Sequence, residues 1–113
     1  MIKGVGVDIV ANNRFISFPK GALAKIFTEY ELKKMEERVC KEEYLSSRFA
    51  VKEAVVKALG TGFRGIGPKD IETVEDDCGR PAVRIRGEVR HSFHLSLSHE
   101  KEYSVAFVVL EEM

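Results

Sequence analysis

Two acidic residues and a lysine have the types and spacing to hold a metal ion against a phosphate group. Glu53 and Lys57 lie four residues apart in a stretch rich in valine and alanine, which puts them on one face of a predicted helix. Asp8 ends an alternating apolar segment far from them in the sequence. Magnesium takes one or two protein carboxylates and completes its shell with water and substrate phosphates. We therefore predict that Asp8 and Glu53 share a magnesium ion and that Lys57 faces the bound phosphates.

The same residues also have an ordinary structural interpretation, which these positions alone leave open. A glutamate followed by a lysine four residues later is a common surface pair that stabilises a helix by about 0.2–0.5 kcal/mol. Asp8 could simply end a strand before the turn residues Asn12 and Asn13. Against this, the apolar setting of Glu53 makes a charge there costly unless a ligand offsets its desolvation.

Residues 60–67 and the pair Ser98 and His99 are further candidates for chemistry. Residues 60–67 form a glycine-rich loop with Arg64, which offers N–H groups and a cation to an anion but matches neither common phosphate-loop template. His99, at an expected hairpin tip, could bind phosphate, transfer a proton or be a plain turn residue. The histidine spacing does not favour zinc, and no strand-turn-helix context supports Ser98 as a nucleophile.

A strand at residues 2–10 is expected to position Asp8. The segment alternates with period two, which is typical of a strand with two different faces. Gly4 and Gly6 lie on the same face as Asp8 and clear it, so that another backbone or a ligand can approach.

Three helices are expected after this strand, and the longest one carries Glu53 and Lys57. Thr28 and Glu31 have the spacing of a capping box at the start of the second helix, and Gly60 stops the third. Arg48 and Lys52 form a second charged strip along the third helix. The predicted helices cover residues 21–27, 29–37 and 41–59.

Strands dominate the chain after the glycine-rich loop. The segment 103–110 is almost entirely apolar, so we expect it to be central and buried in its sheet. A strand and helices followed by several hairpins indicate an α+β fold, with an antiparallel β-sheet packed against helices. The hairpins pair residues 71–75 with 82–86 and residues 94–98 with 103–110.

Bulk properties indicate one domain, residues 1–113, and exclude several kinds of partner. The chain has 18 basic and 18 acidic residues, so its net charge does not predict nucleic-acid binding. No apolar run is long enough to cross a membrane, and the first residues do not resemble a signal peptide. We expect a cytoplasmic protein in which Cys40 and Cys78 are free thiols.

Short blocks across nearly the whole chain resemble the motifs of one enzyme family. Each block is ordinary alone, but the full set in the family's order is specific. On these motifs the chain resembles the holo-acyl-carrier-protein synthases, a family of 4′-phosphopantetheinyl transferases. The blocks are residues 4–10 with Arg14, then 27–32, 49–62, 70–72, 79–81 and 95–99.

The resemblance implies transfer of the phosphopantetheine arm of coenzyme A to a serine of apo acyl carrier protein, in fatty acid biosynthesis. It also implies the 4′-phosphopantetheinyl transferase fold and a homotrimer with sites between neighbouring subunits. By matching position, Asp8 and Glu53 would be the magnesium ligands and Lys57 would contact the pyrophosphate. His99 and Arg48 would lie near the 3′-phosphate of coenzyme A, and the loop residues Gly60, Gly62 and Arg64 would border the cofactor.

Carrier proteins are acidic around their serine, which directs attention to a basic and aromatic segment near Asp8. Such a surface would steer an acidic partner. One departure from the family is Glu100. It follows His99 at a position where the family usually has a small hydroxyl residue, and its negative charge would disfavour a bound phosphate. At least one or two of the three phenylalanines in this segment, Phe15, Phe18 and Phe27, are expected to lie in the core. The predicted docking residues are Arg14, Phe18, Lys20 and Lys25.

Three other functions are weighed against this one. A broad-specificity transferase usually holds two copies of such a unit, whereas this chain has one. A non-catalytic module that binds coenzyme A or a nucleotide would not need Asp8, Glu53 and Lys57 together. If the chain were only a structural trimerising domain, the charges in the helix that carries Glu53 would have no explanation.

Overall fold

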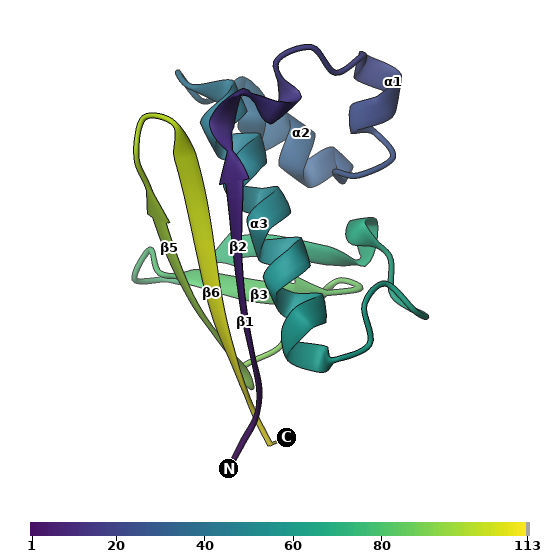
Figure 1. Ribbon diagram of the computed structural model, residues 1–113, viewed down its shortest axis with the longest axis vertical. Helices are drawn as coiled ribbons and strands as arrows, with labels where there is room; N and C mark the ends of the chain where they lie inside the picture. Colours follow the sequence, from purple (N-terminus) through teal and green to yellow (C-terminus); the bar gives the residue numbers. More distant parts are fainter. Residues whose placement is uncertain (113) are drawn as a thin grey trace.

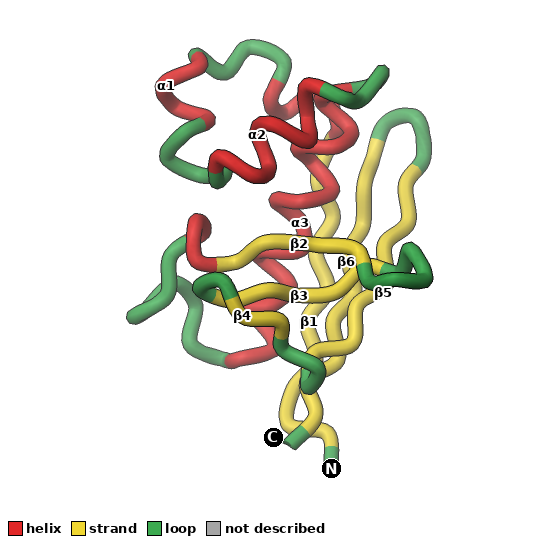
Figure 2. The backbone as a smooth tube through the Cα atoms, turned by 180° about the vertical axis from the view of Figure 1, so that it is seen from behind, coloured by secondary structure: helices red, strands yellow, loops and turns green. Residues whose placement is uncertain are grey.

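The computed structural model describes residues 1–112 and, among these, every side chain except that of Lys20. A long helix, α3, lies between two three-stranded antiparallel sheets, ordered β1-β6-β5 and β2-β3-β4 (Figures 1 and 2). The sheets are formed by β1 (Ile2–Ala11), β2 (Ile71–Glu75), β3 (Pro81–Ile85), β4 (Glu88–Val89), β5 (Phe93–His99) and β6 (Tyr103–Glu111). The helices are α1 (Lys20–Leu23), α2 (Glu29–Glu36), α3 (Lys41–Leu59) and the short 3-10 turns η1 (Asn12–Phe15) and η2 (Pro68–Asp70).

The α+β prediction is confirmed, with two small sheets in place of one. Both predicted hairpins form, because β2 pairs with β3 and β5 pairs with β6 in antiparallel register. β1 pairs with the other edge of β6 and sets Asp8 opposite Ala106. The two ends of the chain therefore lie together, as Figure 1 shows at the foot of the molecule.

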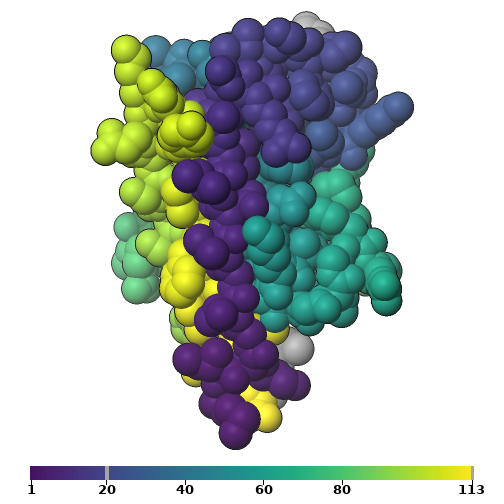
Figure 3. All heavy atoms as spheres, in the orientation of Figure 1, coloured from purple at the N-terminus to yellow at the C-terminus, as the bar shows by residue number. Residues whose placement is uncertain are grey.

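Strand β6 is central, as predicted, but it is buried on one face only. Its residues alternate, so Ala106 and Val108 face the core while Tyr103 and Phe107 are exposed. Val5, Val7 and Ile9 of the neighbouring β1 are exposed as well. Figure 3 shows β1 running along one whole face of the molecule without a covering element. The apolar run in β6 thus reflects two apolar faces, only one of which is covered within a single chain.

Helix α3 packs directly against β1 because two glycines leave room for its backbone. A Cβ atom added to Gly6 would lie 1.9 Å from the carbonyl oxygen of Ala54, and one added to Gly4 would lie 1.9 Å from that of Ala58. No side chain could occupy these positions without moving the helix. The prediction that the glycines admit another backbone is confirmed. Gly60 ends the helix in the left-handed conformation, at φ 77°.

The segment between β1 and α3, residues 12–40, covers the upper end of α3 (Figure 1). The capping box at Thr28 and Glu31 forms as predicted, with both of its hydrogen bonds present. The helix expected at residues 21–27 is shorter and shifted, because only Lys20–Leu23 is helical before the chain turns toward α2. Phe15 and Phe27 are buried in the core beneath this region.

Lys52 is the charged residue whose environment differs most from its predicted one. Its ammonium lies 2.7 Å from Glu31 and also donates to the carbonyl oxygens of Pro68, at 2.8 Å, and Ile71, at 2.5 Å. Burial lowers the pKa of Lys52 and raises the pKa of Glu31, and the charge of each partner opposes both shifts. The charged strip expected with Arg48 does not form. Lys52 instead fastens α3 to α2 and to the start of β2.

In the part of the chain that the structure describes, no helix is long and apolar enough to span a membrane. Cys40 and Cys78 are both free and exposed, as expected.

Candidate functional site

Strand β1 and helix α3 bring Asp8, Glu53 and Lys57 into one cluster. The ammonium of Lys57 lies 3.1 Å from Oδ1 of Asp8 and donates to the carbonyl oxygen of Val7 at 2.9 Å. The charge of Asp8 reaches Glu53, since it contributes to the raised pKa of that carboxyl group. Asp8 and Lys57, which lie 49 positions apart in the sequence, are therefore in contact, and Glu53 lies near enough to Asp8 for their charges to interact.

The electrostatics of the cluster favour an additional cation. Partial burial raises the pKa of Glu53 first, and repulsion from Asp8 raises it further. Lys57 and Arg14 act in the opposite direction, but not enough to cancel the shift. Two neighbouring carboxylates with an unfavourable interaction are stabilised when a divalent ion binds between them.

The donor set suits magnesium better than zinc. Asp8 and Glu53 supply hard oxygen ligands, and magnesium needs only one or two carboxylates when substrate and water complete its shell. Among residues 1–112, no group of three or more acidic, histidine or cysteine side chains forms a closed metal site. With two carboxylates, Asp8 and Glu53 fit a magnesium ion whose other ligands would be water and phosphate oxygens.

The glycine-rich loop begins one turn of helix beyond Lys57. Gly60, Gly62 and Gly65 all have positive φ angles, of 77°, 61° and 73°, which side-chain-bearing residues adopt rarely. Arg64 is exposed in this loop. The backbone is thus open for a ligand to approach, while the roles of Gly60, Gly62 and Arg64 stay predictions.

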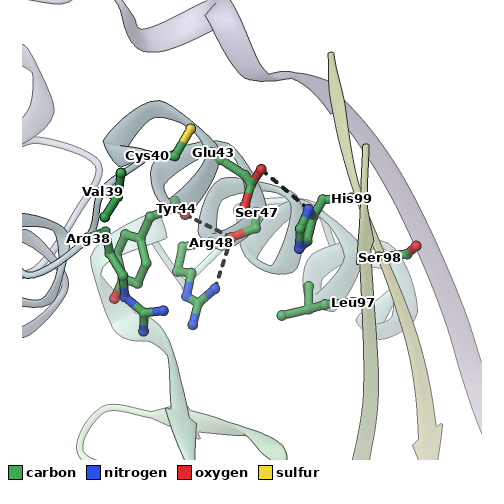
Figure 4. Close-up of a pocket in the computed structure, with 10 residues that line it drawn as sticks. All are labelled: Arg38, Val39, Cys40, Glu43, Tyr44, Ser47, Arg48, Leu97, Ser98 and His99. Carbon is green, nitrogen blue, oxygen red and sulfur yellow. Dashed lines mark hydrogen bonds and ion pairs between the residues drawn. The ribbon is translucent and has the colours of Figure 1, made fainter. Parts of the chain in front are cut away.

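Arg48 and His99 meet in a second place, a hollow of about 350 Å³ between the start of α3 and the end of β5 (Figure 4). Nδ1 of His99 lies 3.3 Å from a carboxylate oxygen of Glu43. Arg48 donates to Ser47 Oγ at 2.9 Å, while its Nε is buried without an acceptor. A second hollow, of about 400 Å³, adjoins it and shares Arg48, Leu97 and His99. We refer to the first as the arginine hollow.

The cluster and the arginine hollow lie on different sides of α3. Five residues separate Arg48 from Glu53, which turns the helix by about 140°. Neither hollow is lined by Asp8, Glu53 or Lys57. A single chain therefore presents two separate groups of predicted site residues, whereas the sequence analysis treated them as one site.

The phenylalanines of the predicted docking segment divide between core and surface, as expected. Phe15 and Phe27 belong to the core, so only Phe18 of the three phenylalanines reaches the surface. Arg14 stacks on the ring of Phe49, at 4.8 Å from its centroid, beside the acidic cluster. Lys25 is exposed, and the side chain of Lys20 lies outside the described part of the structure.

Three residues of the arginine hollow were missed by the sequence analysis. Glu43 is the acid that contacts His99, whereas Glu100 lines neither hollow. The guanidiniums of Arg48 and Arg38 lie 4.3 and 4.9 Å from the ring centroid of Tyr44. The i,i+4 spacing of Tyr44 and Arg48 could have indicated their contact. Arg38 comes from the link between two helices and carries no such signal.

The chain is similar to known proteins over nearly its full length. A family model of the 4′-phosphopantetheinyl transferase superfamily matches residues 4–108. A holo-[acyl-carrier-protein] synthase of Clostridium acetobutylicum is 42% identical over 122 residues, covering 98% of both chains. One of Oceanobacillus iheyensis is 43% identical over 116 residues, again covering 98% of both.

Solved structures show the same fold. The holo-(acyl-carrier-protein) synthase of Bacillus anthracis, in complex with CoA (3′,5′-ADP), has a TM-score of 0.86 and 37% identity, and the match covers 100% of this chain and 99% of that one. The synthase of Neisseria meningitidis has a TM-score of 0.87 and 35% identity, with 99% and 100% covered. Family model, relatives and fold agree over almost the full length, and the chain belongs to the 4′-phosphopantetheinyl transferase superfamily.

Proposed function

We propose that this protein is a holo-acyl-carrier-protein synthase that moves 4′-phosphopantetheine from coenzyme A to a serine of apo acyl carrier protein. The products are the holo carrier and adenosine 3′,5′-bisphosphate. The observation that carries the proposal is the meeting of Asp8, Glu53 and Lys57 at the contact of β1 with α3, in a chain of this superfamily. The cytoplasmic location expected from the sequence stays a prediction.

The acidic cluster would act on the pyrophosphate of coenzyme A. Asp8 and Glu53 would hold a magnesium ion, which supplies Lewis-acid stabilisation of charge on the phosphate oxygens. Lys57 would exchange its contact with Asp8 for the pyrophosphate, where it stabilises the negative charge that develops on the leaving group. The chain thereby mainly positions charged groups around an in-line attack by the serine of the carrier.

The arginine hollow would bind the opposite end of coenzyme A. Arg48 has a buried Nε without an acceptor, and His99 lies beside it. Phosphate oxygens would satisfy such donors with charge-assisted hydrogen bonds. The loop of Gly60, Gly62 and Arg64 would border the same ligand near its pyrophosphate.

The acidic carrier would dock near Arg14 and the exposed Phe18 and Lys25. Arg14 stacks beside the cluster, so a carrier held there would present its serine to the reacting phosphate. Lys20 stays part of this predicted surface. Attraction between opposite charges would accelerate association and weaken with salt.

A homotrimer would reconcile the two separate groups of site residues. Val5, Val7, Ile9 and Phe107 form an exposed apolar face on the β1-β6-β5 sheet, and faces of this kind mark interaction sites. Packing of this face between copies of the chain would set the cluster of one subunit against the arginine hollow of its neighbour. Each complete site would then lie between two subunits.

Mass spectrometry of an apo carrier, incubated with this protein, coenzyme A and magnesium, tests the reaction. A mass gain of one phosphopantetheine group supports the proposal, and Glu53→Gln should abolish that gain while preserving the fold. Binding of coenzyme A without any transfer would instead identify a non-catalytic coenzyme-binding module. Full activity of Glu53→Gln with magnesium would contradict the role of the cluster.

Mixing two inactive variants tests the shared site. Subunits with Glu53→Gln and subunits with Arg48→Glu each lack one half, so random mixing in equal amounts should restore about one quarter of the wild-type sites. If both halves came from the same subunit, mixing would restore no activity. Sedimentation of the unmixed protein should give the mass of three chains.

A further inference from the structure

The turn between β3 and β4 holds a side-chain-bearing residue in an unfavourable backbone conformation. Arg86 has a φ angle of 50° and is the only non-glycine residue with a positive φ in the described part of the chain. It shares the turn with Gly87, whose φ is 82°. Two-residue hairpin turns with two positive φ angles are most often Asn-Gly, because asparagine adopts this conformation more readily than arginine does. A residue that keeps such a conformation at a cost to the fold points to a function for its side chain.

The side chain of Arg86 reaches the glycine-rich loop. Its Nη2 donates to the carbonyl oxygen of Gly65, and its Nε lies 3.6 Å from Oδ1 of Asp70. The other carboxylate oxygen of Asp70 accepts from the backbone N–H of Gly67 at 2.8 Å. The backbone N–H of Arg86 in turn donates to the carbonyl oxygen of Asp70 at 2.8 Å. We refer to Arg86 and Asp70 as the loop clamp, because together they join the end of β3 to two points of the loop.

The loop clamp marks the boundary between a packed part and an open part of the loop. Ile66, which lies between the two contact points, packs against the hydrophobic core. Before Gly65 the loop extends away from the body of the molecule, since a Cβ atom added to Gly62 would meet no atom within 4 Å. Arg64 is exposed and directly precedes the contact with Arg86. The clamp therefore fixes the point at which the open part of the loop is attached.

The contacts of the loop clamp restrict direction more than they add stability. Arg86 and Asp70 are 59% and 35% exposed, and ion pairs with such exposure contribute little to folding. A guanidinium carries its donors in a rigid plane, so it limits the orientation of the carbonyl group that it binds. A loop that is ordered before its ligand arrives loses less freedom on binding, which improves affinity. We therefore expect the main effect of the clamp on substrate binding.

We infer that Arg86 is a positioning residue that holds the glycine-rich loop where it can border coenzyme A. The inference rests on the proposed function and deepens it, because it names the residue that orders the loop of Gly60, Gly62 and Arg64. Arg86 acts through the carbonyl oxygen of Gly65 and not on the reacting groups. Loss of the clamp should therefore raise the KM for coenzyme A and leave kcat nearly unchanged.

Two variants that remove the same contact but differ in backbone preference test the inference. Arg86→Met loses the donor and keeps the unfavourable turn, whereas Arg86→Asn loses the donor and supplies the residue type that this turn prefers. Arg86→Asn should therefore have the higher melting temperature of the two variants. Both should raise the KM for coenzyme A by about threefold to tenfold, while kcat and the KM for the carrier protein change by less than about twofold.

Two further variants and one direct measurement complete the experiment. Arg86→Lys should recover part of the lost affinity, because an ammonium group can still donate to a carbonyl oxygen. Lys69→Met, an equal loss of charge at an exposed residue of η2, should leave both KM values unchanged. Hydrogen exchange of residues 60–67 in the protein without substrate follows the clamp itself, and should be faster in Arg86→Met and Arg86→Asn than in the wild type.

The outcomes distinguish this inference from the proposed function. A KM for coenzyme A that rises only in Arg86→Met, the less stable variant, would show that stability controls binding and would overturn the inference. Unchanged KM values in both variants, or unchanged exchange of the loop, would also overturn it and leave transfer by the wild type intact. A wild type that transfers no phosphopantetheine would overturn the proposed function, and with it the role of the clamp in substrate binding.

Discussion

Helix α3 carries two lysine–carboxylate pairs, five residues apart, whose surroundings are opposite. Lys52 and Glu31 are 1% and 0% exposed, and backbone carbonyls bind the remaining donors of the lysine. Lys57 and Asp8 are 52% and 17% exposed, and the neighbouring Glu53 carries a charge that Lys57 and Arg14 offset only in part. The first pair is closed to solvent and ligands, whereas the second can accept another cation or anion.

This difference shows how the same side-chain chemistry serves two purposes in one helix. A buried pair holds elements together because either charge alone would be strongly disfavoured in the core. A surface pair contributes little to folding, so its members remain free to bind a substrate. Four predictions test the contrast between Lys52 and Lys57, in order of decreasing effect.

The largest effect is expected when the buried pair loses one partner. Lys52→Met leaves the charge of Glu31 in the core without compensation, and should lower the free energy of unfolding by about 3–5 kcal/mol. Urea denaturation measures the change. Adding Glu31→Gln to the same chain removes the stranded charge and should recover much of the loss. A single variant no less stable than the double variant would contradict this interpretation.

The surface pair should show the opposite response. Lys57→Met removes a preorganised cation from the reacting phosphates, and should reduce kcat for transfer by about 10²–10³-fold. Its free energy of unfolding should change by less than about 1 kcal/mol. Steady-state kinetics and urea denaturation of one preparation check both values. A large loss of stability with normal kcat would mean that Lys57 is a structural residue like Lys52.

The contact that positions the second pair can be altered without touching its charges. Gly6→Ala places a Cβ atom against the backbone of α3 at Ala54, and should destabilise the fold by about 1–3 kcal/mol. Because β1 must then move away from α3, transfer should fall as well. Gly21→Ala is the control, since a Cβ there meets no atom within 4 Å. Equal stability of the two variants would contradict the close packing of β1 on α3.

The smallest effect concerns pH. The pKa of Glu53 is raised above its ordinary value of 4.5, so the folded state holds this proton more tightly than the unfolded chain. Its contribution to stability is full below 4.5 and is lost as the pH rises through the raised pKa. Glu53→Gln should therefore raise the melting temperature slightly near neutral pH, and the two proteins should converge in acid. A lower melting temperature for Glu53→Gln near neutral pH would contradict the prediction that the charge of Glu53 destabilises the fold.

Much of the fold could be predicted because local signals agree with the tertiary structure. The capping box at Thr28 and the stop at Gly60 act through neighbouring residues, so α2 and α3 begin and end close to their predicted limits. The alternation around Gly4 and Gly6 predicted a close approach that the structure confirms. The end of the first helix had no comparable signal and was predicted wrongly.

The candidate site could be predicted only in part from residue type and spacing. These left an ordinary helix pair and a strand end as alternatives, and the resemblance of the motifs to one enzyme family favoured a cation shared by Asp8 and Glu53. The burial of Lys52 could not be predicted, since its partners Glu31 and Pro68 belong to separate segments. The contact of Glu43 with His99 likewise depends on where the β5–β6 hairpin ends against α3. Such positions follow from the packing of distant elements.

The two glycines of β1 have a consequence for how this protein can vary. Since Gly4 and Gly6 touch main-chain atoms of α3, the gap between the strand and the helix is set by the thickness of two polypeptide backbones. That gap does not depend on the volume or the rotamer of any side chain. During evolution, apolar residues of the interior can therefore be substituted by other apolar residues, while the separation between the carboxylates of Asp8 and Glu53 stays nearly constant.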